Sequence, residues 1–284
     1  MMKKILCLVM LISINTFAQE ESATAPSDSV KPERKGYWST SLGYTYDFFV
    51  DGYVYVKEVN SIADSLSFNE DLNLSHWHNA ALDVKYTFKN DAALSLSVER
   101  FFFTATNRVK KNIYYNDLII NGSAGISIKG TRMYRGTLLF EKPVTKRGSC
   151  IKASIEAGLM YDYIHFEIAG QIINEGDSLN FKEDFNDQVI PAPVLGAKAE
   201  WFLGSGDRSA ITLEAKGTYV SQWLEIYKYE HTAFNAELGY RFSSRCFFVS
   251  PKLVFRHLHS REDESQHIFD ITTLGANMEV GFKF

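Results

Sequence analysis

Apolar and polar residues alternate with a period of two along most of the chain, in segments separated by short turn-forming stretches. Side chains of a β-strand point alternately to its two faces, so each segment predicts a strand with one apolar and one polar face. These segments lie at residues 38–48, 78–88, 94–99, 134–141, 151–162, 189–203, 211–219, 234–242, 247–256 and 269–284. The pattern therefore predicts an all-β chain of about ten strands, within a range of about 8 to 12.

The connections between these segments alternate in length. The short ones are residues 89–91, 142–149, 204–208 and 243–245. The longer, polar ones lie near 49–75, 105–130, 174–187 and 260–267, and a short connection near 224–231 breaks the alternation. Short turns on one side of a membrane and long loops on the other are typical of a transmembrane antiparallel up-and-down β-barrel. An even number of strands then places both termini on the side of the short turns.

The N-terminal residues have the features of a secretory signal peptide, which we place at residues 1–19. Lys3 and Lys4 precede an apolar stretch that is too short to span a bilayer as a helix. Residues 20–35 are polar and contain two prolines, so we expect a disordered periplasmic segment there. The predicted barrel domain is residues 36–284, which suits one large domain.

The C-terminal segment carries a second signal, because the alternation continues to the last residue and ends on Phe282 and Phe284. Together with the signal peptide, this ending resembles Gram-negative outer-membrane β-barrel proteins, whose last strand the barrel-assembly machinery recognises. The resemblance is to small OmpA/OmpX-like or porin-like barrels at the level of the fold, and it names no subfamily. It implies an outer-membrane location with both termini in the periplasm. It also implies contact with outer-membrane lipid and lipopolysaccharide, and insertion by the assembly machinery.

In a membrane barrel the apolar faces contact lipid and the polar faces line the interior. The alternative is a soluble β-sandwich or lipocalin-like barrel, in which the apolar faces would point inward. The polar faces carry acids and bases in nearly equal numbers. Because unpaired buried charges are costly, we expect a lumen largely plugged by ion pairs and water. The candidates for these pairs are Asp83, Lys85, Glu99, Arg135, Glu156, Lys198, Glu200, Glu214, Lys216, Glu237, Arg241, Lys252, Arg256 and Glu279.

Histidines gather near the expected external strand ends. They include two His-x-His pairs, His76 with His78 and His257 with His259, each of which points to one face of its strand. Imidazoles in this arrangement could bind zinc or copper, or respond to pH. The alternative is a polar rim beside aromatic residues. Those aromatic residues, expected to form an external girdle, are Trp77, Phe101, Phe102, Phe103, Tyr163 and Trp223.

Catalytic chemistry has weak support in the sequence. A rim-site hydrolase of the protease or lipid A hydrolase type would draw on Asp162, His165, His257, His259, Ser260 and Glu262. A serine beside a histidine in sequence is a weak indication, because spatial geometry defines a catalytic triad. We therefore predict no catalytic residue.

Composition narrows the function further. The formal net charge is −4, and loss of Lys3 and Lys4 with the signal would make it −6, which argues against nucleic acid as a partner. Cys150 and Cys246 are too few for a disulfide framework, and we expect free thiols. We predict a small, non-enzymatic outer-membrane barrel without a cofactor, acting as a structural or adhesive protein or a narrow channel. The alternatives are an outer-membrane rim enzyme and a small-solute or metal-handling channel, and the oligomeric state is open.

Overall fold

The protein is described by a computed structural model, which covers residues 36–56, 65–74, 76–115, 118–120, 122, 124–146, 149–174, 177–203, 208–221, 229–262 and 267–284. The predicted signal peptide, the N-terminal segment and Trp223 lie outside these residues. Within the described ranges, no helix has the length and apolar character needed to cross a membrane.

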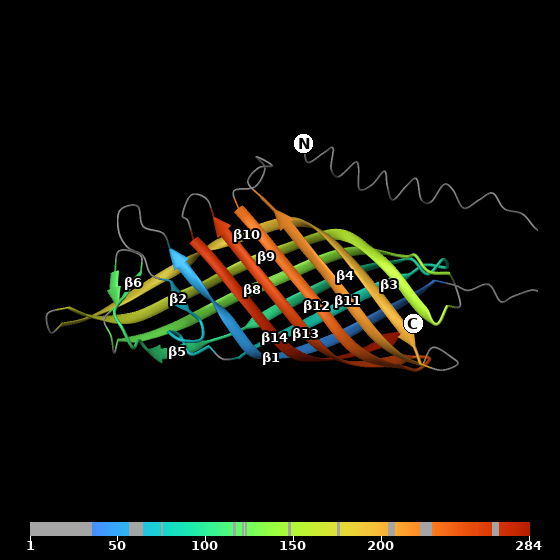
Figure 1. Ribbon diagram of the computed structural model, residues 1–284, viewed down its shortest axis with the longest axis horizontal. Coiled ribbons are helices and arrows are strands. Elements are labelled where there is room, and N and C mark those ends of the chain that lie inside the picture. Colours follow the sequence, from blue (N-terminus) through green and yellow to red (C-terminus); the bar gives the residue numbers. More distant parts are fainter. Residues whose placement is uncertain are drawn as a thin grey trace, which may run out of the picture. The chain divides into compact units, whose positions relative to one another are not determined.

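Ten strands form one closed antiparallel sheet (Figure 1). They are β1 (Tyr37–Val56), β3 (Trp77–Thr87), β4 (Ala93–Phe102), β8 (Gly125–Pro143), β9 (Ile151–Asn174), β10 (Asp177–Phe202), β11 (Ser209–Val220), β12 (Tyr229–Ser243), β13 (Phe247–Glu262) and β14 (His267–Lys283). Each pairs with the next in this order, and β14 pairs with β1 from Ser39–Lys283 to Val56–His267. Closure removes the sheet edges, and it confirms the predicted all-β barrel of about ten strands.

Four shorter strands lie among the long ones. β2 (Leu66–Ser67) pairs with β1, and β5 (Ala105–Arg108) pairs with β8. β6 (Ile113–Tyr115) and β7 (Leu118–Ile120) pair only with each other. All four fall in segments that the sequence pattern predicts as long external loops.

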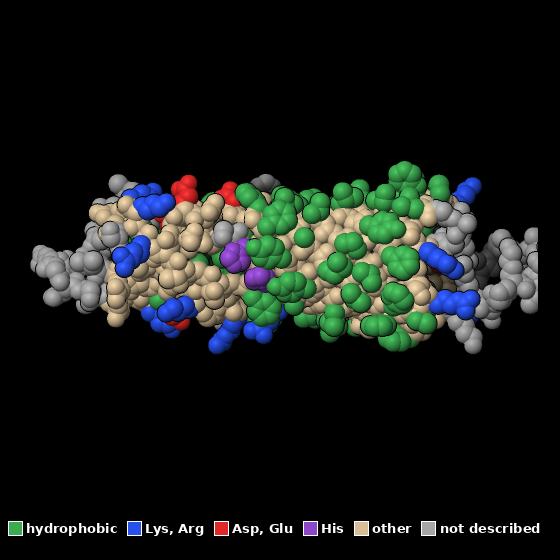
Figure 2. Space-filling view, turned by 90° about the horizontal axis from the view of Figure 1, so that it is seen from below, with side chains coloured by type: hydrophobic (Ala, Val, Ile, Leu, Met, Phe, Trp, Pro, Cys, Tyr) green, Lys and Arg blue, Asp and Glu red, His purple; other side chains and the backbone are tan. Residues whose placement is uncertain are grey.

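The outer face of the barrel carries an apolar belt, which is the green region in Figure 2. The belt lies in the half of the barrel that holds Tyr37 and Phe284, here called the proximal half; the opposite half is the distal half. Every barrel strand contributes at least one side chain that is between 44% and 71% exposed: Leu42, Leu82, Leu96, Leu138, Leu159, Leu195, Leu213, Leu238, Leu253 and Met278. A continuous apolar surface on a closed barrel matches the band that faces lipid in membrane barrels.

In two strands, a bulge changes which positions point inward. Positions of one parity face the interior in the proximal half, and positions of the other parity face it in the distal half. In β1 the register moves from Asp47↔Gly275 to Phe49↔Leu274, so Phe48 is an extra residue. Asp47 points inward before the bulge, whereas Val50 and Val54 point inward after it. β8 has a similar irregularity between Lys129 and Arg132. Because the side-chain period is two, one extra residue turns apolar positions from the outer face to the interior.

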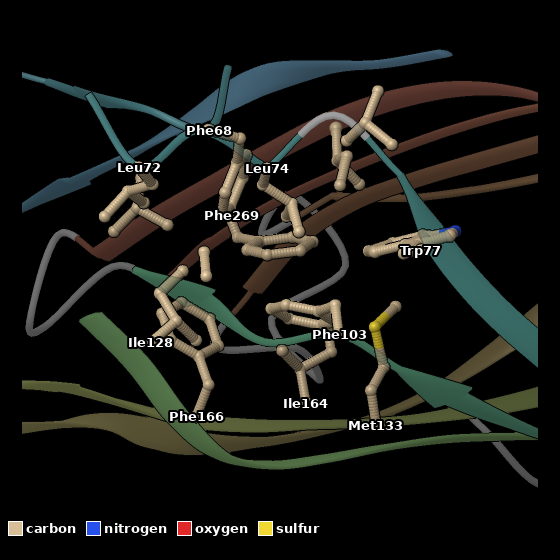
Figure 3. Packing of buried hydrophobic residues seen from close by; sticks show 14 of the residues in the cluster. Phe68, Leu72, Leu74, Trp77, Phe103, Ile128, Met133, Ile164, Phe166 and Phe269 are labelled. Carbon is tan, nitrogen blue, oxygen red and sulfur yellow. The ribbon is translucent and has the colours of Figure 1, made fainter. Parts of the chain in front are cut away.

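The distal interior is filled by apolar side chains, which we call the apolar plug (Figure 3). The plug consists of Val50, Val54, Leu66, Phe68, Leu72, Leu74, Trp77, Phe101, Phe103, Ile126, Ile128, Met133, Ile164, Phe166, Ile168, Phe269 and Ile271. A chain of ring contacts crosses it, from Phe68 to Phe269 (5.5 Å between ring centroids), then to Phe166 (5.7 Å) and Phe103 (6.2 Å). The plug therefore joins β9 and β14 to the segments that hold Phe68 and Phe103.

Two expectations from the sequence are wrong in this region. Residues 65–74 were expected in a polar external loop, yet Leu66, Phe68, Leu72 and Leu74 belong to the plug. The external girdle was expected to include Trp77, Phe101 and Phe103, yet these are only 1%, 2% and 5% exposed inside the barrel.

The strand period itself accounts for the burial of two of these rings. Trp77 stands two positions from Asn79 on β3, and Phe101 stands two positions from Glu99 on β4. Both therefore share the interior face with those polar residues. Phe102, one position on, is 39% exposed on the outer face.

Candidate functional site

The interior face changes from polar to apolar within two residues along the strands. Glu99, Arg135 and Asp162 lie side by side on β4, β8 and β9. Two residues further toward the distal end, the same faces carry Phe101, Met133 and Ile164, again in register. The polar layer beneath this boundary and the apolar plug above it together form the candidate functional site.

A buried ion pair lies directly beneath the plug. Arg135 donates from Nε to Asp162 Oδ1 at 2.7 Å and from its second terminal nitrogen to Oδ2 at 2.8 Å. On the far side of the lumen, His231 of β12 brings Nε2 to 3.2 Å from Asp162 Oδ2. This group thus links β8 and β9 to β12 across the interior, and both Asp162 and His231 are essentially inaccessible to water. The two-point geometry of Arg135 is the strong form of a carboxylate pair.

A second buried group lies near the bulge of β1. Arg256 of β13 approaches the two carboxylate oxygens of Asp47 at 3.2 and 3.4 Å. It also donates to Thr45 Oγ1 at 3.2 Å, and Asn277 Nδ2 donates to the same hydroxyl at 2.9 Å. These contacts join β13, β14 and β1, where the barrel closes.

The remaining interior charges form a continuous set of pairs in the proximal half. Lys252 lies between Glu237 (2.9 Å) and Glu279 (2.8 Å), and Arg241 lies 2.5 Å from Glu200. The other pairs are Lys198 with Glu200 (3.6 Å) and Glu214 (3.9 Å), Lys216 with Glu214 (3.0 Å), and Lys85 with Glu141. Most of the ion-pair candidates predicted from the sequence thus lie inside the barrel beside an opposite charge.

Three predicted candidates have no ion pair in the described part of the chain. Glu99 accepts a hydrogen bond from Asn79 Nδ2 at 2.8 Å instead. Asp83 lies within the same inward-facing layer, opposite Ser97 in register. One carboxylate oxygen of Glu156 is buried without a hydrogen-bond partner among the described residues. These three acids therefore lie inside the barrel without a base within ion-pair distance among the described residues.

Comparison with known proteins gives a result for the fold alone. No protein-family model and no curated protein matches the sequence. Among solved structures, the outer membrane protease OmpT from Escherichia coli is similar with a TM-score of 0.52 and 6% identity, over 90% of this chain and 99% of that chain. OprG from Pseudomonas aeruginosa has a TM-score of 0.36 and 10% identity, over 89% of this chain and 97% of that one. Ail of Yersinia pestis has a TM-score of 0.30 and 13% identity, over 88% and 100%.

The chain has the fold of a Gram-negative outer-membrane β-barrel. In this barrel, Phe282 lies near the end of β14 on the outer face and Phe284 follows the strand; they are 53% and 74% exposed. Cys150 and Cys246 are both free and exposed near the same end. Phe282 pairs in register with Thr40 of β1 and Phe247 of β13, so the predicted assembly signal lies at the seam where the barrel closes.

The histidine pairs of the barrel point outward on separate strands. His78 Nδ1 lies 2.6 Å from the Tyr44 hydroxyl, and the rings of His76 and His78 are 5.8 Å apart. Figure 2 shows histidine side chains at the distal edge of the apolar belt. On β13, His257 Nδ1 lies 3.0 Å from Thr272 Oγ1, and His259 Nδ1 lies 2.9 Å from Asp270 Oδ2. The described residues contain no group of three potential ligands that could hold a metal ion, so the two pairs are not combined into one site.

The residues considered for a rim hydrolase lie on opposite faces of the barrel wall. Ser260 points inward and is fully buried, whereas His257 and His259 of the same strand point outward. His165 lies in register with Arg132 on the outer face, and the side chain of Glu262 lies outside the described residues. The structure therefore separates His165, His257 and His259 on the outer face from Asp162 and Ser260 in the interior.

His231, a further histidine near an expected external strand end, lies inside the barrel near a serine and a carboxylate. His231 is opposite Ser260 in register and 3.2 Å from Asp162. The alternation of β12 could have revealed its inward position, because Asn235 and Glu237 share its parity. All three residues are buried, and Arg135 donates to Asp162 at 2.7 Å.

Proposed function

We propose that this protein is an occluded outer-membrane barrel with a structural or adhesive role, in which the proximal half spans the membrane and the distal half extends outside the cell. The apolar belt supports the membrane placement, because it surrounds the proximal half and ends before the distal half begins (Figure 2). With the short turns on the periplasmic side, both termini lie in the periplasm.

The observation that carries this proposal is the apolar plug. A conducting barrel needs a water-filled path, whereas the rings of Phe68, Phe103, Phe166 and Phe269 meet across the distal interior. Apolar side chains packed in this way exclude water, because their exposure to it is unfavourable.

The layer beneath the plug supports the same conclusion. A void there, lined by Arg135, Met160, Lys216, Thr218 and Asn235 among others, has a volume of only about 10 Å³. That is at the lower limit of the space that one water molecule occupies. A layer of paired charges and an apolar layer thus follow one another along the lumen.

Electrical recording tests the proposal directly. The mature protein is refolded into planar lipid bilayers, with heat-modifiable gel mobility as proof that the barrel has formed and a general porin as positive control. We expect no steady openings above the baseline. Stable conductance steps from the folded protein would overturn the occluded barrel and favour a narrow channel.

Thiol labelling gives an independent measure of the plug. In a background with Cys150→Ser and Cys246→Ser, we introduce Ile164→Cys inside the plug and Lys129→Cys on the exposed outer face as its matched control. A small thiol reagent is expected to modify Lys129→Cys rapidly and Ile164→Cys only after unfolding. Equal labelling rates would show that water reaches the plug and would contradict the proposal.

A further inference from the structure

His257 and His259 lie side by side on the outer face of β13. Phe255 precedes them on the same face and is 39% exposed, as an outward apolar residue. Positions two apart on a strand share one face, and their Cα atoms are about 6.7 Å apart. The side chain of His259 is 27% exposed, so water and dissolved ions reach it.

Both rings are held through the same ring nitrogen by an oxygen of β14. His257 Nδ1 lies 3.0 Å from Thr272 Oγ1, and His259 Nδ1 lies 2.9 Å from Asp270 Oδ2. No other described residue forms a hydrogen bond with either ring. Because an ionised carboxylate only accepts, a neutral His259 donates from Nδ1 and keeps its lone pair on Nε2. Histidines that bind a metal ion through one nitrogen almost always have the other nitrogen held by an oxygen in this way.

The histidine pair of β3 has different surroundings. His78 Nδ1 lies 2.6 Å from the Tyr44 hydroxyl, and its ring centroid is 5.3 Å from that of Tyr46. The ring of His76 is 5.9 Å from the same tyrosine and stands at 78° to the ring of His78. Rings packed edge to face and against a tyrosine are less free to turn toward one shared ion. The structure therefore distinguishes two pairs that have the same spacing in the sequence.

The outer surface around the β13 pair is acidic. Asp270 of β14 lies in the row of His259, and Asp51 of β1 lies in the row of His257. Arg261, the next outward residue of β13, is opposite Glu230 of β12 in register, so these two charges offset one another. Beside neutral imidazoles, the two aspartates leave a negative charge that attracts a cation.

We propose that His257 and His259 form a site for a late divalent transition-metal ion, such as Zn²⁺ or Cu²⁺, which binds to both Nε2 atoms while water completes its coordination. Imidazole nitrogens suit these ions, and two rings on adjacent positions of one strand face can share an ion at bond lengths of about 2.0–2.1 Å. Thr272 and Asp270 hold the rings in place, and Asp270 offsets part of the charge of the ion. The site lies on the outside of the wall, so the inference goes beyond the occluded barrel and does not rest on it.

Isothermal titration of the folded, tag-free barrel with Zn²⁺ tests the proposal. The parent protein carries Cys150→Ser and Cys246→Ser, so that no thiol binds the ion. We expect one saturable site, and His257→Gln or His259→Gln should weaken it at least about 10-fold, because one of two protein ligands is lost. Asp270→Asn retains an acceptor but loses the charge, and it should weaken binding about 10-fold.

The matched control is His76→Gln/His78→Gln, which should leave the affinity unchanged. Heat-modifiable gel mobility shows that each variant has folded. Electron paramagnetic resonance of bound Cu²⁺ gives a second measure, with coupling to two imidazole nitrogens expected in the parent protein and to one in each single variant of β13.

Three results would overturn the proposal: no saturable heat, equal affinity after His257→Gln/His259→Gln, or loss of binding in the β3 control. Coupling of Cu²⁺ to fewer than two nitrogens in the parent protein would do the same, and this result needs no variant to fold. Stable conductance would overturn the occluded barrel and leave the metal site unaffected, so the two proposals fail separately.

Discussion

The pair between Arg135 and Asp162 is predicted to be the most strongly coupled polar contact in the barrel. Replacing Asp162 with Asn, or Arg135 with Met, leaves the remaining partner beneath the apolar plug without the charge that it contacts most closely. Asp162 is only 1% exposed and accepts two short hydrogen bonds, at 2.7 and 2.8 Å. Breaking such a buried pair from one side destabilises a protein by about 3–5 kcal/mol. Water cannot take the place of the lost partner, because Met133 and Ile164 cover the pair from the distal side.

The double variant Arg135→Met/Asp162→Asn separates this effect from simple loss of contacts. It removes both charges, so its cost is expected to be well below the sum of the two single costs, with a coupling energy of about 2–3 kcal/mol. The free energy of unfolding of all four proteins is measured by urea titration in lipid vesicles, followed by tryptophan fluorescence and heat-modifiable gel mobility.

The exposed pair between Lys182 and Glu167 is the control for this cycle. Its atoms are 2.9 Å apart, but the lysine side chain is 60% exposed, so a coupling of about 0–1 kcal/mol is expected. Additive effects of Arg135→Met and Asp162→Asn, within about 0.5 kcal/mol, would refute the reasoning that burial makes this pair strong.

Three further predictions concern the wall of the barrel. Gly158→Ala is expected to destabilise the barrel by about 1–3 kcal/mol in the same urea assay, because an added Cβ would lie 1.9 Å from the Leu138 carbonyl oxygen. Gly136→Ala is the control and should be tolerated, because its added Cβ meets nothing within 4 Å. Deletion of Phe48 removes the β1 bulge and is expected to abolish heat-modifiable mobility, whereas Phe48→Leu should fold; a folded deletion variant would contradict the role of the bulge. In intact cells, Cys150 and Cys246 should resist a membrane-impermeant maleimide until the outer membrane is permeabilised, and earlier labelling would reverse the proposed orientation.

The barrel itself could be predicted from the sequence because its signals are local. Alternation with a period of two shows in the sequence without any knowledge of the partner strand. Each segment that predicts a strand lies within, or nearly within, one of the ten barrel strands. The lipid-facing positions also follow from parity, as Leu42, Leu195 and Leu253 illustrate, because the outer face of a membrane barrel must be apolar along its whole spanning length.

The distal half could not be predicted in the same way. The bulge at Phe48 moves Val50 and Val54 to the interior, and nothing in the local sequence marks the extra residue, because it becomes visible only against the register of β14. The burial of Phe68 depends likewise on its contact with Phe269, about two hundred positions away in the chain. A segment that alternates poorly by itself is therefore easily assigned to a loop.

Part of the candidate site could likewise be predicted from the sequence, and part could not. That Arg135, Asp162 and Arg256 face the interior follows from strand parity, which the sequence shows. Which acid each base meets does not follow from it, because Asp162 approaches His231 across the lumen and Arg256 reaches Asp47 two strands away. Similar numbers of acids and bases in the sequence do not ensure that every charge finds a partner. One buried carboxylate oxygen of Glu156 has no hydrogen-bond partner in the described part of the chain.

By itself, the sequence determined the class of fold, the number of strands and the face of each strand that meets lipid, because all three depend on a repeat of two residues within a single segment. Only the tertiary structure decided that apolar side chains fill the distal interior and that Trp77 and Phe103 are among them. These features depend on strand registers, bulges and contacts across the barrel. They form when segments that are distant in the sequence come into contact. The period-two pattern of a single segment gives no information on the free energy of those contacts.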